Sequence, residues 1–272
     1  MMRVYSHAHG RLQEYVAKSR GYFRKFGVDW IESPLPKPNE LHATIQVSGP
    51  SAYADFIKKS ARFHLSSTSH WAVARACHEG YGSLWRGGYS LMPAGIYGAP
   101  TGELRTAQDL AGVNITVGRH SGAHFAATHA LSGLLERSAI SFSFIEGPGN
   151  RLQHLLSGST PAACIYGFDS YFLEQIGFKK IIDVSFLVTF MIMEADDAPT
   201  GFFEAIARSQ RDIDEQGAAL RLQYLHHEAT WNDHAFDALK SGSGERYVTA
   251  TYTDDMFDAA LKTARDVMEN YS

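Results

Sequence analysis

One segment of the chain constrains its fold more than any other. In it an apolar strand, a glycine-containing turn and a helix follow each other without a break. The strand covers residues 113–117, the turn contains Gly118 and Gly122, and the helix continues to Leu135. Glycine lets the backbone come close to a bound group. The first N–H groups of the helix attract anions, and Arg119 lies beside them. This unit predicts an anion site at the end of a buried strand.

The same alternation of strand and helix runs through most of the chain. Strands are expected at residues 3–6, 28–31, 62–66, 113–117, 140–145, 162–166 and 180–184. Helices are expected at residues 12–26, 51–61, 149–156, 169–176, 200–217 and 253–270. Such alternation favours an α/β fold with largely parallel sheets and helices on both faces. Ligands of these sheets bind outside the carboxyl ends of the strands.

Two segments resemble a known superfamily. Residues 16–28 read VAKSRGYFRKFGV, and residues 104–112 read LRTAQDLAG. The first is similar to the pattern A-K-x-x-G-Y-F-x-x-x-G-L/V of the nitrate/sulfonate/taurine-binding and thiamine-pyrimidine-synthase-like branch of the type II periplasmic-binding-protein superfamily. The second resembles the lead-in to the second-lobe strand of the same proteins. The resemblance implies a two-lobed α/β fold with a ligand cleft between the lobes.

The resemblance also implies how the chain divides into domains. Residues 1–96 and 193–272 would form domain 1, and residues 97–192 would be inserted as domain 2. Residues 80–100, rich in glycine and tyrosine, would carry the chain across, and residues 187–194 would bring it back. The superfamily contains solute-binding components of ABC importers and enzymes without an export signal, such as aromatic sulfinate desulfinase and dihydroxyphthalate decarboxylase.

Composition narrows the range of partners. The 272 residues carry a net charge of −4, without a run of Lys or Arg, which argues against nucleic acid. Two cysteines outside any CxxC pair argue against a disulfide scaffold. The N-terminus lacks the features of a secretion signal, and no run reaches the roughly 18 apolar residues of a membrane span. We expect a cytoplasmic protein, or a periplasmic one if an export signal has been removed. No cofactor is expected, and a homodimer is left open.

Four loops are expected to meet at one edge, at residues 6–10, 66–71, 118–124 and 166–170. Guanidinium groups make charge-assisted, bidentate bonds to carboxylate, sulfonate or phosphate, so Arg119 is expected to clamp an acidic group. A surface ion pair is the alternative for this arginine. The predicted ligand-binding residues of these loops are Ser67, Ser69, Arg119, His120, Ser121, Gly122, Tyr166 and Asp169.

Three histidines of the same loops, His7, His9 and His70, are the predicted catalytic residues. Imidazole changes its protonation state near neutral pH and can transfer protons. His7 and His9 could also ligate a metal, but two ligands alone are weak evidence, and no metal site is predicted. Polar loop histidines without chemistry are the other alternative. The related desulfinase carries a nucleophilic cysteine in the first loop, where this chain has Ala8, so cysteine-based desulfination is not expected.

Two functions of different class follow. The first is an enzyme that acts on a small, aromatic organic acid as a decarboxylase-like lyase. Arg119 would hold the acid while His7, His9 or His70 moves a proton. The alternative is the solute-binding component of an ABC importer for a small organic anion. It would use the same site without chemistry and have a permease as its partner.

Overall fold

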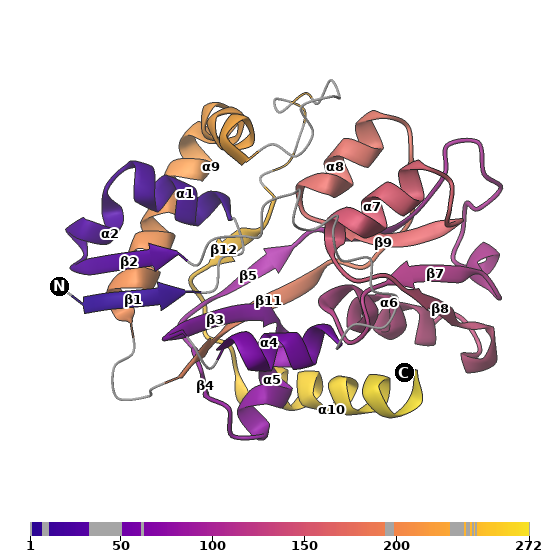
Figure 1. The fold of residues 1–272 in the computed structure, drawn as a ribbon, viewed down its shortest axis with the longest axis horizontal. Coiled ribbons are helices and arrows are strands. Elements are labelled where there is room, and N and C mark those ends of the chain that lie inside the picture. Colours follow the sequence, from indigo (N-terminus) through magenta and orange to yellow (C-terminus); the bar gives the residue numbers. More distant parts are fainter. Residues whose placement is uncertain are drawn as a thin grey trace.

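The computed structural model of the chain describes residues 2–6, 11–32, 51–60, 63–193, 199–228, 237, 240, 242 and 244–271. Two β-sheets lie side by side, each flanked by helices (Figure 1). The larger sheet contains β1 (Met2–Ser6), β2 (Val28–Glu32), β3 (Leu65–Ser69), β4 (Ser83–Leu84), β5 (Tyr89–Met92), β11 (Phe186–Ile192) and β12 (Arg246–Val248). The smaller sheet contains β6 (Ala94–Gly98), β7 (Asn114–Val117), β8 (Ser141–Phe144), β9 (Ala162–Tyr166) and β10 (Lys179–Asp183).

The strand orders are β12-β5-β11-β3-β1-β2 in the larger sheet, with β4 beside β11, and β10-β6-β9-β7-β8 in the smaller one. β1 pairs in parallel with β2 and β3, and β7 pairs in parallel with β8 and β9. The remaining pairs, β11 with β3, β4 and β5 among them, are antiparallel. In Figure 1 the arrowheads of β1 and β2 point toward the smaller sheet, and that of β7 points back toward the larger one. Strand ends from both sheets therefore face the boundary between them.

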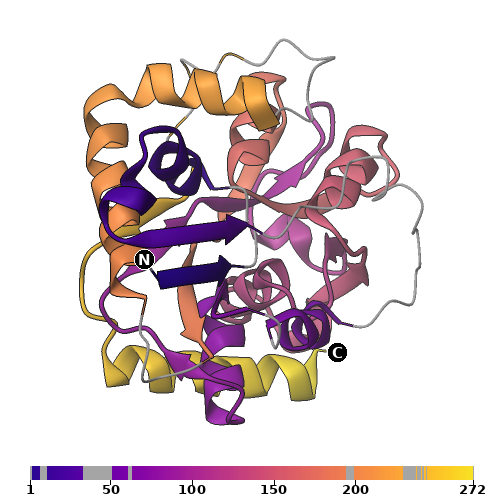
Figure 2. The ribbon, with the colours of Figure 1, turned by 60° about the vertical axis from the view of Figure 1, so that its left-hand side comes forward.

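Helices cover both sheets. They are α1 (Leu12–Ser19), α2 (Tyr22–Lys25), α4 (Ala52–Ser60), α5 (His70–His78), α6 (Gly122–Ser132), α7 (Pro148–Leu156), α8 (Phe168–Gln175), α9 (Thr200–Glu228) and α10 (Asp254–Asn270). Short 3-10 turns cover Gln108–Leu110 and Arg137–Ala139. α9 packs on α1 and α2, and α10 packs on α5 and α6. Figures 1 and 2 both show α10 running along the bottom of the molecule.

Two segments connect the sheets. Pro93 joins β5 to β6, and Val184 with Ser185 joins β10 to β11. The N–H of Val184 donates to the carbonyl of Ala94 at 3.0 Å, and the N–H of Ala94 donates to the Ser185 hydroxyl at 3.2 Å. These bonds tie the outgoing and the returning segment together. The domain bounds expected from the sequence, 1–96 with 193–272 and 97–192, stay a prediction.

An apolar core continues across the boundary. Val73 of α5, Ile115 of β7, Phe125 of α6, Met191 of β11 and Ala264 of α10 belong to one cluster and are fully buried. The helices α5, α6 and α10 therefore pack together and join the two sheets along one side. In the part of the chain that the structure describes, no helix is both long and apolar enough to cross a membrane.

Two predicted elements differ from the observed ones. The helix expected over residues 12–26 is broken, because Gly21 takes the left-handed conformation (φ +69°) between α1 and α2. The strand expected over residues 62–66 is β3 instead, which lies three residues later in the chain. Ser67 and Ser69 are therefore strand residues rather than loop residues, because they pair with Phe190 and Val188 of β11.

Candidate functional site

The turn between β7 and α6 presents unpaired N–H groups. Ser121 caps α6: its hydroxyl accepts a bond from the N–H of His124 at 3.4 Å. His120 adopts a left-handed conformation (φ +54°), which lets the chain reverse before the helix begins. The N–H groups of Gly122 and Ala123 have no acceptor among the described residues. They lie at the positive end of an eleven-residue helix, which favours a negative charge.

Three polar side chains converge above Gly118. A Cβ atom at this position would lie 3.0 Å from Arg151 Nη1 and 3.2 Å from both Glu146 Oε2 and Ser121 Oγ. Any other residue would occupy the space where these groups meet. Gly118 therefore lets a cation, a carboxyl group and a hydroxyl approach one another at a point that a side chain would crowd.

Arg151 is the residue that sequence reasoning missed. It lies on α7, is 2 % exposed, and its guanidinium carbon is 5.6 Å from the centre of the Tyr166 ring. Its Nη1 donates a weak bond to the Ile145 carbonyl at 3.3 Å, while its buried Nε has no partner within the described part of the chain. A buried cation with so few bonds is costly unless an anion completes its shell. The sequence offers one indication of this residue, which is a charge next to Leu152 on the side of the helix that is buried.

Glu146 and Arg119 complete the charge of this cluster. The Arg119 N–H donates to Glu146 Oε1 at 2.7 Å. Burial raises the pKa of Glu146 above its usual value, although this N–H and the charges of Arg151 and Arg119 oppose the rise. The guanidinium of Arg119 lies over the Phe144 ring, 4.2 Å from its centre. Two guanidinium groups against one carboxyl leave a net charge of at least +1, which suits an anion.

The larger sheet meets this cluster at Ser69 and Phe186. A Cβ atom at Gly122 would lie 3.1 Å from the Ser69 Cβ and 2.9 Å from the Phe186 ring, so the N-terminus of α6 touches the other sheet directly. The Ser69 side chain is 1 % exposed, and its hydroxyl has no partner among the described residues. The Phe186 ring packs edge-on against the Tyr166 ring at 6.0 Å. A buried, unpaired hydroxyl and two aromatic rings thus border the unpaired N–H groups.

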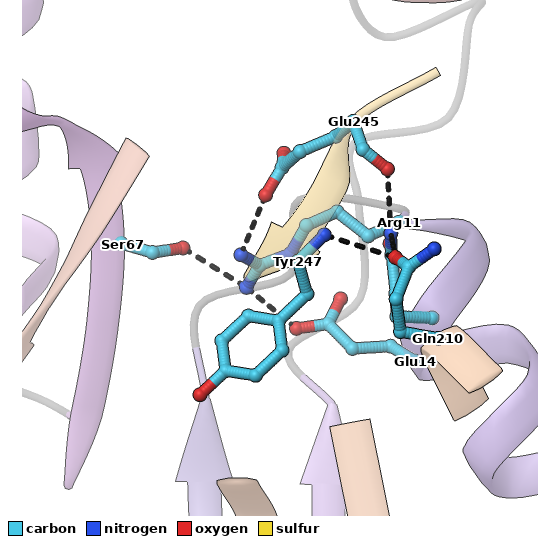
Figure 3. Close-up of polar contacts among 7 residues, drawn as sticks. Arg11, Glu14, Ser67, Gln210, Glu245 and Tyr247 are labelled. Atoms are coloured by element: carbon cyan, nitrogen blue, oxygen red, sulfur yellow. Dashed lines mark hydrogen bonds and ion pairs between the residues drawn. The ribbon is translucent and has the colours of Figure 1, made fainter. Parts of the chain in front are cut away.

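Ser67 belongs to a different cluster, shown in Figure 3. Its hydroxyl accepts a bond from Arg11 Nη2 at 3.1 Å. The buried Arg11 guanidinium also pairs with Glu14 at 2.7 Å and with Glu245 at 3.1 Å, and lies 4.8 Å from the centre of the Phe190 ring. Two carboxylates against one guanidinium leave a net charge of −1. This cluster ties the start of α1 to β3 and to the segment before β12, and it repels an anion.

His70 contacts the returning segment. Its Nδ1 lies 2.9 Å from the Leu187 carbonyl oxygen, and burial lowers its pKa to about 4 in spite of this hydrogen bond. Its ring packs on Trp71 at 4.0 Å, Trp71 packs on Phe186, and Phe186 packs on Tyr166. These rings connect His70 with the Arg151 cluster without a direct polar contact.

The structure brings some of the predicted site residues together. Ser69, Arg119, Ser121, Gly122 and Tyr166 border the cluster around Arg151, as described above. His120 follows Arg119 in the same turn, and its backbone N–H donates to His124 Nδ1 at 3.2 Å. Asp169 lies in the first turn of α8.

The other site predictions remain open. His7 and His9 fall outside the described residues. No group of three or more His, Cys, Asp or Glu side chains within the described ranges is placed to hold a metal ion.

Comparisons with known proteins bear on the fold. No protein-family model matches the chain. No curated protein matches its sequence. Solved structures do match. The alkanesulfonate-binding protein of Xanthomonas axonopodis pv. citri, bound to MOPS, superposes with a TM-score of 0.70 at 14 % identity, over 99 % of this chain and 93 % of the other.

Two further structures are similar over nearly the whole chain. The periplasmic aliphatic sulphonate binding protein of Escherichia coli gives a TM-score of 0.64 at 17 % identity, covering 99 % of this chain and 92 % of that one. A desulfurization enzyme gives 0.60 at 11 % identity, covering 100 % and 93 %. The two sheets and these likenesses confirm the fold class predicted from the sequence. The chain has the two-lobed, type II periplasmic-binding-protein-like α/β fold.

Proposed function

We propose that this protein binds a small organic anion, a sulfonate or a carboxylate, where the two sheets meet. The observation that carries the proposal is Arg151, a buried guanidinium that makes one weak hydrogen bond and lies beside the N-terminus of α6. Charge-assisted bonds from guanidinium and backbone N–H groups are the strongest means by which proteins hold such anions.

The rest of the cluster fits the same ligand. The N–H groups of Gly122 and Ala123 and the hydroxyl of Ser69 would complete the bonds to the acidic group. The Tyr166 and Phe186 rings would contact its apolar part. Two of the similar solved structures are sulfonate-binding proteins, which supports this ligand class. The proposal includes the domain division expected from the sequence, because the ligand would then lie between domains.

The test is calorimetric titration with MOPS and with benzoate. Arg151→Gln should weaken binding of whichever anion binds by roughly 1.5–3 kcal/mol, the range for hydrogen bonds to charged groups, which is about 10- to 150-fold. Arg119→Gln should have a smaller effect, because its guanidinium is stacked on Phe144. Arg24→Gln, an exposed position on α2, is the matched control and should change nothing. Equal affinity of the Arg151 and Arg24 variants would refute the site.

Binding of this kind serves two functions, and the proposal extends to both. A solute-binding component of an ABC importer, with a permease as partner, needs nothing more. A decarboxylase-like enzyme acting in the cytoplasm would also need a proton-transfer group. The likeness to a desulfurization enzyme favours keeping this second candidate. Of the three predicted catalytic histidines, His70 is the one that lies among the described residues. Burial lowers its pKa to about 4, so its imidazole is neutral at pH 7 and could accept a proton from a ligand that extends past the Phe186 ring.

Turnover distinguishes the two candidates. Carbon dioxide release from aromatic acids that bind would establish the enzyme. His70→Asn should then abolish release while affinity stays within about tenfold of the parent, since a general acid or base contributes roughly 10²–10⁴-fold to the rate. Binding without any release would leave the importer component as the function.

A further inference from the structure

A pocket lies beside the segment that returns from the smaller sheet to the larger one. Its volume is about 370 Å³, which is within the range of small-molecule sites. Residues of α5, of α6 and of the returning segment line it, so its walls come from elements flanking both sheets. Trp71, Phe186 and Leu187 supply apolar surface, and His70, His129 and Asp183 supply polar groups.

This pocket borders the anion site, with which it shares the Phe186 ring, and extends to another face of the larger sheet. Arg11 contacts both Phe190 and its cross-strand partner Ser67, so these two side chains share one face of the larger sheet. Side chains alternate along a strand, which places Leu187, three residues before Phe190, on the opposite face. Leu187 pairs with Leu91, which also lines the pocket. Leu187 and Leu91 therefore place part of the pocket on the face of the sheet away from Arg11.

The hydrogen bonding of His70 determines what the pocket can recognise. The Leu187 carbonyl accepts hydrogen bonds only, so in the neutral imidazole the proton lies on Nδ1 and donates to it. Nε2 then carries a lone pair and acts as an acceptor. A ligand that meets this atom must offer a hydrogen-bond donor.

The charge of the pocket also favours a ligand that donates hydrogen bonds. Asp183 is the one acidic side chain among the described residues that line it, and none of these residues is Lys or Arg. Burial acts to raise the pKa of Asp183, but the Ser185 N–H at 3.0 Å and the Lys180 ammonium lower it below its usual value. The carboxylate is therefore ionised at neutral pH. Apolar walls that contain a Trp and a Phe, next to this charge, suit an aromatic ring that carries a cation.

We infer that this pocket is a second binding site, specific for a small arylalkylamine. The ring lies against Trp71 and Phe186, and the ammonium donates to Asp183 and to His70 Nε2. Carboxylates and sulfonates should be excluded from it, because the described residues that line the pocket offer them a carboxylate and a lone pair and no Lys or Arg side chain. The inference does not rest on the anion site proposed above, although Phe186 borders both sites.

Titration calorimetry with 2-phenylethylamine tests the inference. Saturable binding is expected in the parent protein. Ala130→Phe fills the pocket from a half-buried position on α6 and should weaken binding at least tenfold. Asp183→Asn removes the charge without adding volume and should weaken it about tenfold, as for loss of a hydrogen bond to a charged group. Ala259→Phe, on an exposed face of α10, is the matched control and should bind like the parent.

A second ligand separates the two sites. 3-Phenylpropionate has the same ring and the opposite charge, and its affinity should not respond to Ala130→Phe. Arg151→Gln should leave 2-phenylethylamine binding unchanged. The inference is overturned if 2-phenylethylamine shows no saturable binding, if both Ala130→Phe and Asp183→Asn bind it like the parent, or if Ala130→Phe weakens 3-phenylpropionate as much as 2-phenylethylamine. Should Ala130→Phe fail to fold, Asp183→Asn alone decides.

Discussion

The buried Arg11 cluster allows a prediction about stability. Arg11→Met keeps an apolar stem of similar length and removes the guanidinium. It leaves the carboxylates of Glu14 and Glu245, whose side chains are 2 % and 5 % exposed, without their cation. Burial alone would lower the pKa of Arg11, but these two carboxylates raise it, so the folded state strongly favours the charged guanidinium.

The magnitude follows from what is left behind. Three hydrogen bonds are lost, to Glu14, Glu245 and Ser67, and two negative charges remain in the same buried space. Breaking a buried ion pair by removing one partner costs about 3–5 kcal/mol. Since domains of this kind are stable by roughly 5–15 kcal/mol, the variant should lose a large fraction of its free energy of unfolding.

Urea denaturation at pH 7 and pH 5 measures the loss. Without their cation, the buried carboxylates should have raised pKa values in the folded variant. The loss of free energy of unfolding is therefore fully present above these pKa values, where the carboxylates are charged. It becomes smaller as the pH falls through these values and the carboxylates are protonated. The loss should therefore be smaller at pH 5. Adding Glu14→Gln and Glu245→Gln to Arg11→Met should restore part of it. Arg246→Met is the matched control, since its ion pair with Asp214 is half-exposed and contributes about 0–1 kcal/mol. A loss below about 1 kcal/mol, or the same loss at both pH values, would refute the reasoning.

Two other predictions concern packing and pH. Gly122→Ala places a Cβ 2.9 Å from the Phe186 ring and 3.1 Å from Ser69, so it should cost about 1–3 kcal/mol in thermal or urea unfolding and weaken anion binding. Gly149→Ala, with nothing within 4 Å, should be neutral or stabilising, and equal effects of the two would contradict the contact. Burial lowers the pKa of His70 to about 4 and of His124 to about 3, so the unfolded state, with a histidine pKa of about 6.5, takes up protons first. Stability should fall between pH 6.5 and 4. His124→Gln should flatten this dependence, and an unchanged slope would argue against a neutral buried His124.

Most of the architecture could be predicted because it rests on local patterns. The strand Ala162–Tyr166 has the bounds that its apolar run indicates, and Gly27, just before β2, takes the left-handed conformation (φ +75°) that glycine adopts readily. The position of β3 could not be read in the same way. Its sequence, LSSTS, has few apolar residues, and it is a strand because β11 pairs with all of it. Long-range pairing of this kind overrides local propensity.

Part of the candidate site could be predicted for the same reason. The turn before α6 carries a local signal, and the structure places Ser121 and Gly122 at the boundary of the sheets. The sequence around Arg151 has no such local signal, apart from its place on the apolar side of α7. The residue reaches Gly118 only because α7 packs beside β9. His70 is expected at the site because it lies in one of the four loops. Its hydrogen-bond partner is the carbonyl of Leu187, and strand alternation places the Leu187 side chain on the sheet face opposite Ser67. Which face of a sheet a residue serves depends on register, and a single sequence does not state it.

The two arginine clusters have opposite net charge, and this difference sets the orientation of a bound organic anion. Around Arg11 the larger sheet already has two carboxylates for one guanidinium, so the cation is satisfied inside the protein. Around Arg151 and Arg119 the smaller sheet has one carboxyl for two guanidinium groups, and burial raises the pKa of that carboxyl. An acidic group placed between the sheets is therefore repelled by the first cluster and attracted by the second. Under the proposed function, the acidic group of the ligand points toward α6 and α7, and its apolar part points toward Phe186.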